Sequence, residues 1–287
     1  MKISTETGSI SDILGHQCAL EYIARAGFDA YDFSMFEMAK FLWKSHTIMD
    51  TKSPLRESGY LDYIRDIKKL GESLNIHCNQ THAPFPTYVP EVRAYLERAI
   101  ECTAELGAEI CVVHPFNNMG IPENTAFYNE ILPYAKSLGV KIATENMFSW
   151  GGNPPKAGPA ACSDHTAFLD LVEAVDDPYL VACLDIGHAE MAGLNTSAVE
   201  MIHTLGKHIK ALHIHDNDKV SDLHAIPFTK NIDFAPVVKA LKDINYSGYF
   251  TLEPSYALDG CEKENVFEMV CQMADSAKKL VNMYENC

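Results

Sequence analysis

Hydrophobic and polar residues form two alternating patterns along this chain. Short apolar runs rich in β-branched residues are typical of buried strands, and apolar residues at three-to-four spacing are typical of amphipathic helices. The strand-like runs cover 2–7, 28–34, 75–82, 109–115, 140–146, 180–187, 209–216 and 248–254. The helix-like stretches cover 61–74, 91–106, 168–175, 196–206, 234–244 and 264–284.

The regular alternation of strand and helix favours parallel strands joined by crossover helices. Eight such strands with about eight helices predict an α/β fold in which the sheet closes into a (β/α)8 TIM barrel. No glycine-rich phosphate loop follows the first strand, which argues against a dinucleotide-binding sheet. Barrels of about 250 residues are commonly one domain. Because no linker or low-complexity segment occurs, we expect residues 1–287 to form a single barrel domain.

Two segments interrupt the rhythm, 35–59 after the second strand and 148–165 after the fifth. Each follows the carboxyl end of a predicted strand, and active sites of barrels form at this face. We expect 148–165, which is rich in glycine and proline, to form a wall of a substrate site. The segment 35–59, which is rich in aromatic residues and methionine, fits a lid or a contact surface between copies in a homo-oligomer equally well.

Composition narrows the class of protein. No stretch of about 18 apolar residues occurs, so no membrane-spanning helix is expected. The first ten residues lack a basic-then-apolar signal, and nine cysteines without a CxxC pair indicate reduced, buried thiols; both favour a cytoplasmic protein. The net charge of −16 argues against a nucleic-acid partner, because Lys and Arg supply much of the affinity for phosphates.

Histidines and carboxylates stand at the ends of successive predicted strands. They are His82, His114, Glu145, Asp185, His213 and Glu253. The carboxyl ends of barrel strands open onto one mouth, where unpaired carboxylates would repel one another and resist desolvation. A divalent cation offsets this repulsion, and mixed imidazole and carboxylate ligands suit Zn²⁺, Mn²⁺ or Fe²⁺ better than Ca²⁺. The pattern therefore predicts a metal site at the mouth.

Four of the strand ends, KIATEN, CLDIGHAEMAGLN, LHIHDN and FTLEP, resemble the metal-bearing strand ends of the xylose-isomerase-like barrel superfamily. That superfamily includes sugar and sugar-phosphate isomerases and epimerases, inosose dehydratases and endonuclease IV. The likeness spans the third to the eighth strand. It implies a single Zn²⁺ or Mn²⁺ ion held by Glu145, Asp185, His213 and Glu253, with Glu145 and Glu253 also catalytic. His188 would face the substrate or a second metal.

The resemblance leaves the register of the seventh strand open. His215-x-x-Asp218 fits the family pattern nearly as well as His213-x-x-Asp216 does. The two histidines share one face of the strand, so both are expected to reach the site. We favour His213 as the ligand because Asp216 and Asn217 follow it as in the family pattern.

The number of metal ions is also open, between one and three. In endonuclease IV, additional ligands from strands three and four and from an Asp-x-His build a three-zinc cluster. This chain has a candidate for every such position, as a substrate contact or an additional ligand: His82, His114, His188, His215, Asp222 and His224. The acidic net charge, the lack of a stretch rich in Arg and Lys near the strand ends, and AIPFTKNIDF in place of a glycine-containing turn argue against the nuclease.

The leading hypothesis is isomerisation or epimerisation of a small sugar, sugar phosphate or polyol. The metal would hold adjacent substrate oxygens, and the two glutamates would remove and return a carbon-bound proton through a metal-stabilised enediolate. Candidates for an aromatic substrate wall are Phe85, Phe116, Phe148 and Trp150. The alternatives are dehydration of a cyclic polyol or keto acid, zinc-dependent cleavage at abasic DNA, and metal-dependent sugar binding without turnover.

Overall fold

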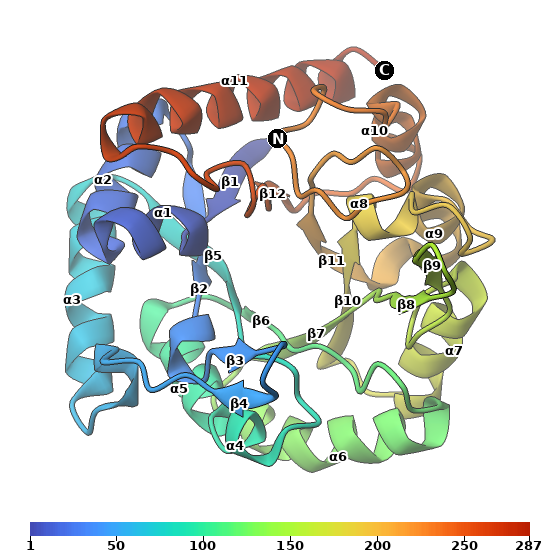
Figure 1. Cartoon of the computed structure of the whole chain (residues 1–287), viewed down its shortest axis with the longest axis horizontal. Helices are drawn as coiled ribbons and strands as arrows, with labels where there is room; N and C mark the ends of the chain where they lie inside the picture. Colours follow the sequence, from blue (N-terminus) through green and yellow to red (C-terminus); the bar gives the residue numbers. More distant parts are fainter.

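The computed structural model describes residues 1–287 and contains an eight-stranded parallel sheet in the order β11-β10-β7-β6-β5-β2-β1-β12. The strands are β1 (Lys2–Glu6), β2 (Ala30–Ser34), β5 (His77–His82), β6 (Ile110–Val112), β7 (Lys141–Glu145), β10 (Leu180–Asp185), β11 (Ile209–His213) and β12 (Tyr249–Leu252). A parallel bridge between Ile214 and Leu252 joins the two outer strands at their carboxyl ends. The sheet therefore closes on itself, and Figure 1 shows the resulting ring.

Helices surround the sheet on the outside (Figure 1). They are α1 (Gly8–Leu14), α2 (His16–Ala26), α3 (Tyr60–Ser73), α4 (Pro90–Arg93), α5 (Leu96–Leu106), α6 (Ile121–Ser137), α7 (His165–Val175), α8 (Ile186–Ala189), α9 (Ala198–Leu205), α10 (Phe234–Asp243) and α11 (Val266–Glu285), with short 3₁₀ turns η1 (Phe36–Met38), η2 (Pro54–Arg56), η3 (Gly206–His208) and η4 (Lys263–Asn265). The main hydrophobic core contains 67 buried residues. None of the helices combines the length and apolar character needed to span a bilayer.

The predicted TIM barrel is confirmed, and each predicted strand overlaps an observed one. The helix predicted over 91–106 is divided into α4 and α5 at Ala94 and Tyr95. Two helices begin with a side-chain cap: the Asp164 carboxylate accepts hydrogen bonds from the first turn of α7, and the Ser197 hydroxyl accepts one from the Glu200 amide of α9. Local hydrogen-bonding chemistry therefore fixes where these helices begin.

The apolar pattern did not predict three of the helices, α1, α2 and α6. The first two are separated by Gly15, whose φ of 81° breaks what would be a continuous helical pattern. The third carries Pro122 in its first turn and Pro133 inside, and its amphipathic pattern is weak. Glycine and proline residues, which usually mark turns, therefore prevented the prediction of these helices.

The two segments that interrupt the sequence rhythm each form a small antiparallel hairpin. These are β3 (Phe41–Leu42) with β4 (Thr47–Ile48), and β8 (Ser149–Gly151) with β9 (Lys156–Gly158). Figure 1 shows both hairpins beside the opening of the ring. Residues of both segments line the cavity described below.

Candidate functional site

A cavity of about 840 Å³ opens at the carboxyl ends of the barrel strands. Its volume lies within the range of about 300–1,000 Å³ that is usual for small-molecule sites. The candidate residues in its walls are His82, Phe85, His114, Glu145, Phe148, Trp150, His188, Asp222, His224 and Glu253. Asp185, His213 and His215 do not line the cavity, and each is fully buried.

Four of the predicted residues converge, and we call them the central group: Glu145, Asp185, His213 and Glu253. Their ligand atoms lie within 4.8 Å of one another, and all four residues are buried. Register places Asp185 of β10 beside His213 of β11. The His213 Nδ1 atom lies 3.1 Å from Glu145 Oε1 and 3.7 Å from Glu253 Oε2. Neighbouring strand ends thus bring together the set that the sequence predicted.

The central group has the electrostatics of a cation site. Glu145 Oε2 and Asp185 Oδ2 are buried and accept no hydrogen bond. Burial alone would raise the pKa of Glu145, but His213 and His114 hold that pKa well below its usual value. Burial alone would lower the pKa of His213, but Cys183, Glu253 and Glu145 raise it well above its usual value. The low pKa of Glu145 and the unused oxygens of Glu145 and Asp185 fit a divalent cation.

Two histidines adjoin this group and form, with Glu145, what we call the His82 group: His82, His114 and Glu145. His82 Nε2 lies 2.8 Å from His114 Nε2, which lies 3.2 Å from Glu145 Oε2. Burial lowers the pKa of His114 although Glu145 opposes this effect. A neutral imidazole presents one lone pair, so two facing ring nitrogens share either a proton or a cation.

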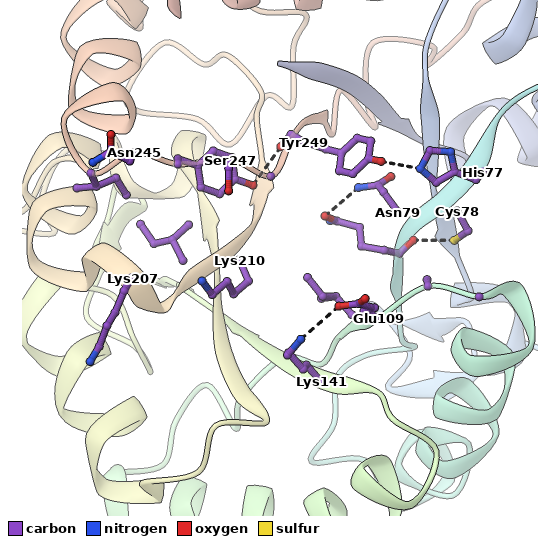
Figure 2. A pocket seen from close by; sticks show the side chains of 18 of the residues that line it. His77, Cys78, Asn79, Glu109, Lys141, Lys207, Lys210, Asn245, Ser247 and Tyr249 are labelled. Atoms are coloured by element: carbon purple, nitrogen blue, oxygen red, sulfur yellow. Dashed lines mark hydrogen bonds and ion pairs between the residues drawn. The ribbon is translucent and has the colours of Figure 1, made fainter.

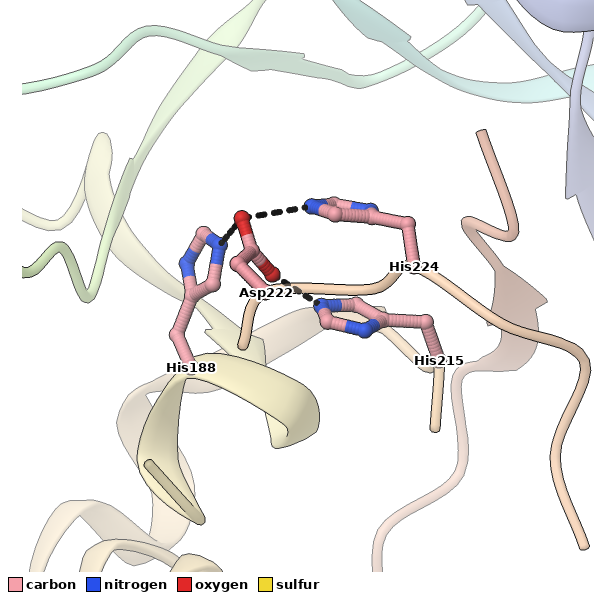
Figure 3. A group of neighbouring side chains, drawn as sticks. All are labelled: His188, His215, Asp222 and His224. Carbon is pink, nitrogen blue, oxygen red and sulfur yellow. Dashed lines mark ion pairs between the residues drawn. The ribbon is translucent and has the colours of Figure 1, made fainter. Parts of the chain in front are cut away.

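The remaining candidates form the Asp222 group: His188, His215, Asp222 and His224 (Figure 3). Asp222 Oδ2 lies 3.6 Å from His188 Nε2 and 3.3 Å from His224 Nε2. Burial opposes the charge of Asp222, but His188 and His224 hold its pKa below the usual value. His215 stacks on His224 at 3.8 Å, and neither ring nitrogen of His215 has a hydrogen-bond partner.

Backbone carbonyls fix the orientation of two of these rings. His188 Nδ1 lies 3.0 Å from the Asn146 carbonyl, and His224 Nδ1 lies 2.9 Å from the Glu253 carbonyl. Since a carbonyl only accepts, both Nδ1 atoms carry a hydrogen, and both Nε2 atoms face Asp222. Metal-ligating histidines are held in this way by their second nitrogen, so the Asp222 group also fits a cation.

The structure separates the two histidines of the seventh strand region. His213 lies in the central group and His215 in the Asp222 group. The ring of His215 packs against Gly187, where a Cβ atom would lie only 2.0 Å away. Asp216 accepts hydrogen bonds from the Lys230 and Ile232 amides at 2.8 and 3.0 Å, so it braces the following loop.

Aromatic residues form part of the cavity wall. Phe85 stacks on His114 at 4.7 Å, and Phe148 lies edge-on to His188 at 5.1 Å. Trp150 is 51% exposed and packs edge-on against Phe148. Phe116 differs from its sequence assignment: it does not line the cavity and instead stacks on Phe127 of α6 at 4.4 Å.

The mouth of the cavity is acidic outside the three groups as well. Glu6, Asp12, Glu37 and Asp259 line it, whereas Lys40 is its one lysine and no arginine contributes. Lys40 lies 2.9 Å from the Asp12 carboxylate, so its charge is paired. The walls therefore offer little attraction for phosphate groups.

Three buried polar residues of the site escaped the sequence analysis. Glu6 ends β1 and accepts hydrogen bonds from the amide and hydroxyl of Ser9, and burial raises its pKa to about 7. Asp32 and Gln80 contact His213 from across the barrel. The one sequence feature that could have indicated Asp32 is its place near the end of a strand. Many carboxylates without a functional role occupy the same place, so this feature alone did not single it out.

The chain is similar to several known proteins. The family model described as xylose isomerase-like TIM barrel matches residues 20–277. An uncharacterized protein of Methanocaldococcus jannaschii is 30% identical over 205 residues, which are 65% of this chain and 68% of that protein. A D-tagatose 3-epimerase-like protein has a similar structure, with a TM-score of 0.73 at 23% identity over 100% of this chain and 99% of its own. L-ribulose 3-epimerase has a TM-score of 0.70 at 17% identity over 99% and 95%. The structural likeness concerns the fold, and the match of the family model decides membership: the chain belongs to the xylose isomerase-like TIM-barrel family.

Proposed function

We propose that this protein is a divalent-metal-dependent isomerase or epimerase of a small sugar or polyol. The observation that carries the proposal is the central group, in which three carboxylates and one imidazole converge at the base of a partly aromatic cavity. Structures of the same fold that are described as sugar 3-epimerases support the class of reaction. We propose Zn²⁺ or Mn²⁺ as the ion, because both accept mixed nitrogen and oxygen ligands.

When bound, the ion supplies a Lewis acid that polarises the substrate carbonyl and lowers the barrier to removing the adjacent proton. Glu253 lines the cavity, and we assign it as the base because of this position. Burial alone would raise its pKa, but His213, His82 and His224 hold the pKa well below its usual value. It is therefore ionised and can accept a proton from the carbon next to the carbonyl.

Epimerisation requires a second group that returns the proton on the other side of the reacting carbon. Glu145 lines the same cavity from β7 and belongs to the same cluster as Glu253 of β12. His82 and His188 also line the cavity and can hydrogen-bond sugar hydroxyls, while Phe85 and Trp150 can pack on the apolar face of a sugar. This assignment gives each wall of the cavity a role in holding or converting the sugar.

The charge of the mouth favours an uncharged substrate over a sugar phosphate. Four carboxylates surround the rim and walls beyond the metal-binding groups, and Lys40 is already paired with Asp12. Binding a phosphate there would bring like charges together without an arginine or a free lysine to compensate.

The test is conversion of a panel of ketoses by the Mn²⁺-loaded protein, followed by chromatography of the products. The panel contains D-fructose, D-tagatose, D-allulose and L-ribulose, and we expect an epimer or an aldose from at least one of them. Glu253→Gln should abolish conversion, whereas Glu268→Gln, an exposed residue of α11, should leave it unchanged. Full turnover by Glu253→Gln would refute the assignment of the base. A product that lacks one water would instead favour the dehydratase reaction.

A second candidate function is zinc-dependent phosphodiester cleavage at abasic DNA. The observation in its favour is that the central, His82 and Asp222 groups adjoin one another and together offer enough ligands for three ions. The acidic mouth and the paired Lys40 oppose it, because DNA binding needs unpaired cationic residues. Incubation of the Zn²⁺-loaded protein with an abasic duplex tests it, and nicking would overturn the sugar proposal.

A further inference from the structure

We infer that the sugar converted by this protein carries a second sugar ring, and that exposed aromatic side chains at the mouth of the cavity bind this ring. The inference rests on the proposed function and names the substrate class of the same site, a ketose glycosylated at the end away from its carbonyl. The observation that carries it is the placement of the exposed aromatic residues of the whole molecule around one opening.

Four aromatic side chains of the protein are exposed, and all four line the cavity at the carboxyl ends of the strands. We call them the mouth aromatics: Trp43, Tyr88, Trp150 and Tyr256. They are between 47% and 56% exposed, and they include both tryptophans of the chain. Exposed apolar surface that gathers in one place usually marks a binding site, so the mouth is the strongest candidate on this molecule.

The mouth aromatics come from segments that follow four different strands. Trp43 lies in the turn between β3 and β4, after β2, and Trp150 lies in β8, after β7. Tyr88 lies between β5 and α4, and Tyr256 follows β12. Figure 1 shows the two hairpins on different sides of the opening. The mouth aromatics therefore surround the opening and do not form one flat patch.

Two of the mouth aromatics connect directly to the walls of the proposed reaction site. Trp150 packs edge-on against Phe148 at 5.0 Å, and Phe148 lies edge-on to His188 at 5.1 Å. Tyr256 lies edge-on to His224, also at 5.1 Å. A sugar held beside these histidines therefore has its far end next to the mouth aromatics, and Trp150 borders both the first ring and the second.

The size of the cavity leaves room for the second ring. Its volume of about 840 Å³ lies near the upper end of the range of about 300–1,000 Å³ in which proteins bury drug-sized ligands. A single ketose is smaller than such a ligand, so it fills the base of the cavity and leaves the outer part free.

The polar residues of the same cavity suit a sugar better than a second copy of the chain. Asp12, Glu37 and Asp259 line it with the mouth aromatics, and carboxylate oxygens accept hydrogen bonds from sugar hydroxyls. A two-fold contact between copies brings the same patch of both together, so these carboxylates would face one another. An uncharged glycosyl group covers the aromatic faces without this repulsion.

The other large cavity of the barrel has no such set of exposed aromatic residues. It measures about 500 Å³ and lies at the amino ends of the strands (Figure 2). Its aromatic residues are Tyr246, which is buried, and Tyr249, whose hydroxyl lies 2.6 Å from His77 Nε2. Exposed aromatic side chains therefore distinguish the carboxyl end of the barrel from the amino end.

The experiment titrates the Zn²⁺-loaded protein with D-fructose, isomaltulose and lactulose. Both disaccharides consist of fructose glycosylated at the end away from the carbonyl. Because both tryptophans lie at the mouth, intrinsic tryptophan fluorescence reports binding there without the need for turnover. We expect at least one disaccharide to change the emission and to bind about tenfold more tightly than D-fructose, the usual effect of one well-packed aromatic contact.

Tyr256→Ala tests the role of the mouth aromatics and keeps both tryptophans for the measurement. We expect its affinity for the disaccharide to fall about tenfold, toward that for D-fructose. Trp43→Ala should have the same effect, measured by calorimetry. Both side chains are exposed, so their truncation leaves the core intact. The matched control is Leu138→Ala, which truncates a 39% exposed side chain at the end of α6, outside the cavity, and should keep wild-type affinity.

Three results would overturn the inference. They are equal affinity for D-fructose and both disaccharides, wild-type affinity for the disaccharide in both aromatic variants, and an equal loss in Leu138→Ala. Sedimentation velocity tests the competing occupant: dissociation of an oligomer by Tyr256→Ala or Trp43→Ala would show that the mouth aromatics contact a second copy. Failure of the Mn²⁺-loaded protein to convert any ketose, free or glycosylated, would refute the proposed function itself, and the fluorescence titration does not depend on that result.

Discussion

Removing the metal should lower the thermal stability of the protein, and Glu145→Gln should abolish most of this dependence. Glu145 is the residue shared by two groups. Its Oε1 atom lies 3.1 Å from His213 Nδ1, and its Oε2 atom lies 3.2 Å from His114 Nε2. One substitution therefore removes an anionic oxygen from the central group and from the His82 group together.

The size of the effect follows from ligand linkage. A metal present at 100 times its dissociation constant stabilises the folded state by about 2.7 kcal/mol. In a protein of this size class, each kcal/mol corresponds to roughly 2–4 °C, so the midpoint should rise by about 5–10 °C. If Glu145→Gln weakens binding 100-fold, the same metal concentration stabilises the variant by only about 0.4 kcal/mol, or roughly 1–2 °C.

The assay is differential scanning fluorimetry of chelator-stripped protein with excess EDTA or with excess Mn²⁺. Glu268→Gln on the exposed face of α11 is the control, and it should keep the full metal-dependent shift. The reasoning is refuted if folded wild-type protein shows no shift with Mn²⁺ or Zn²⁺. It is also refuted if Glu145→Gln keeps the wild-type shift.

Three further predictions concern other parts of the site. Asp222→Asn should lower the metal content of Zn²⁺-loaded protein by one ion per chain, measured by plasma mass spectrometry; unchanged content would show that the Asp222 group holds no ion. Glu6→Gln should stabilise metal-free protein by about 3 kcal/mol at pH 8 and by little at pH 4.5, because burial raises the pKa of Glu6 from 4.5 to about 7 and stability is lost as pH rises through that range; urea unfolding that gives equal differences at both pH values would contradict this. Trp150→Ala should raise KM for the confirmed sugar about tenfold with kcat nearly unchanged, and an equal fall in kcat would argue against a stacking role.

The central group was predictable because residues at the ends of successive barrel strands lie close together in space, although they are about 30–40 residues apart in the sequence. The carboxyl ends of parallel barrel strands meet at one opening, so polar residues at the ends of several strands were expected to form a cluster there. The strand pattern indicated six such residues, and the family resemblance selected Glu145, Asp185, His213 and Glu253 among them. The same reasoning placed His82 and His114 beside them.

Other features could not be read from the sequence because they depend on packing across the barrel. Asp32 and Gln80 reach His213 from the opposite wall, and nothing local to either strand indicates this contact. Phe116 resembled a wall residue by position, but a neighbouring helix offered Phe127 as a stacking partner. Side-chain direction at loop positions is set by such tertiary partners and not by strand periodicity.

The separation of His213 from His215 was also beyond the sequence. Both side chains point to the same face of the chain, and the decision between two groups rests on depth in the barrel. His213 ends β11 beside Asp185, whereas His215 lies beyond the strand and against Gly187. The structure therefore places each histidine in a different group of side chains, and the two groups adjoin because His215 Nε2 lies 3.1 Å from Asp185 Oδ1.

The most direct test of a metal-dependent proton transfer is exchange of a carbon-bound hydrogen with solvent. The Mn²⁺-loaded protein is incubated with each ketose in D₂O, and proton NMR follows the hydrogens next to the carbonyl. The account predicts that deuterium replaces one such hydrogen in a sugar that is also epimerised, and that EDTA or Glu253→Gln stops the exchange. Conversion without any deuterium uptake, or exchange that survives metal removal, would contradict it.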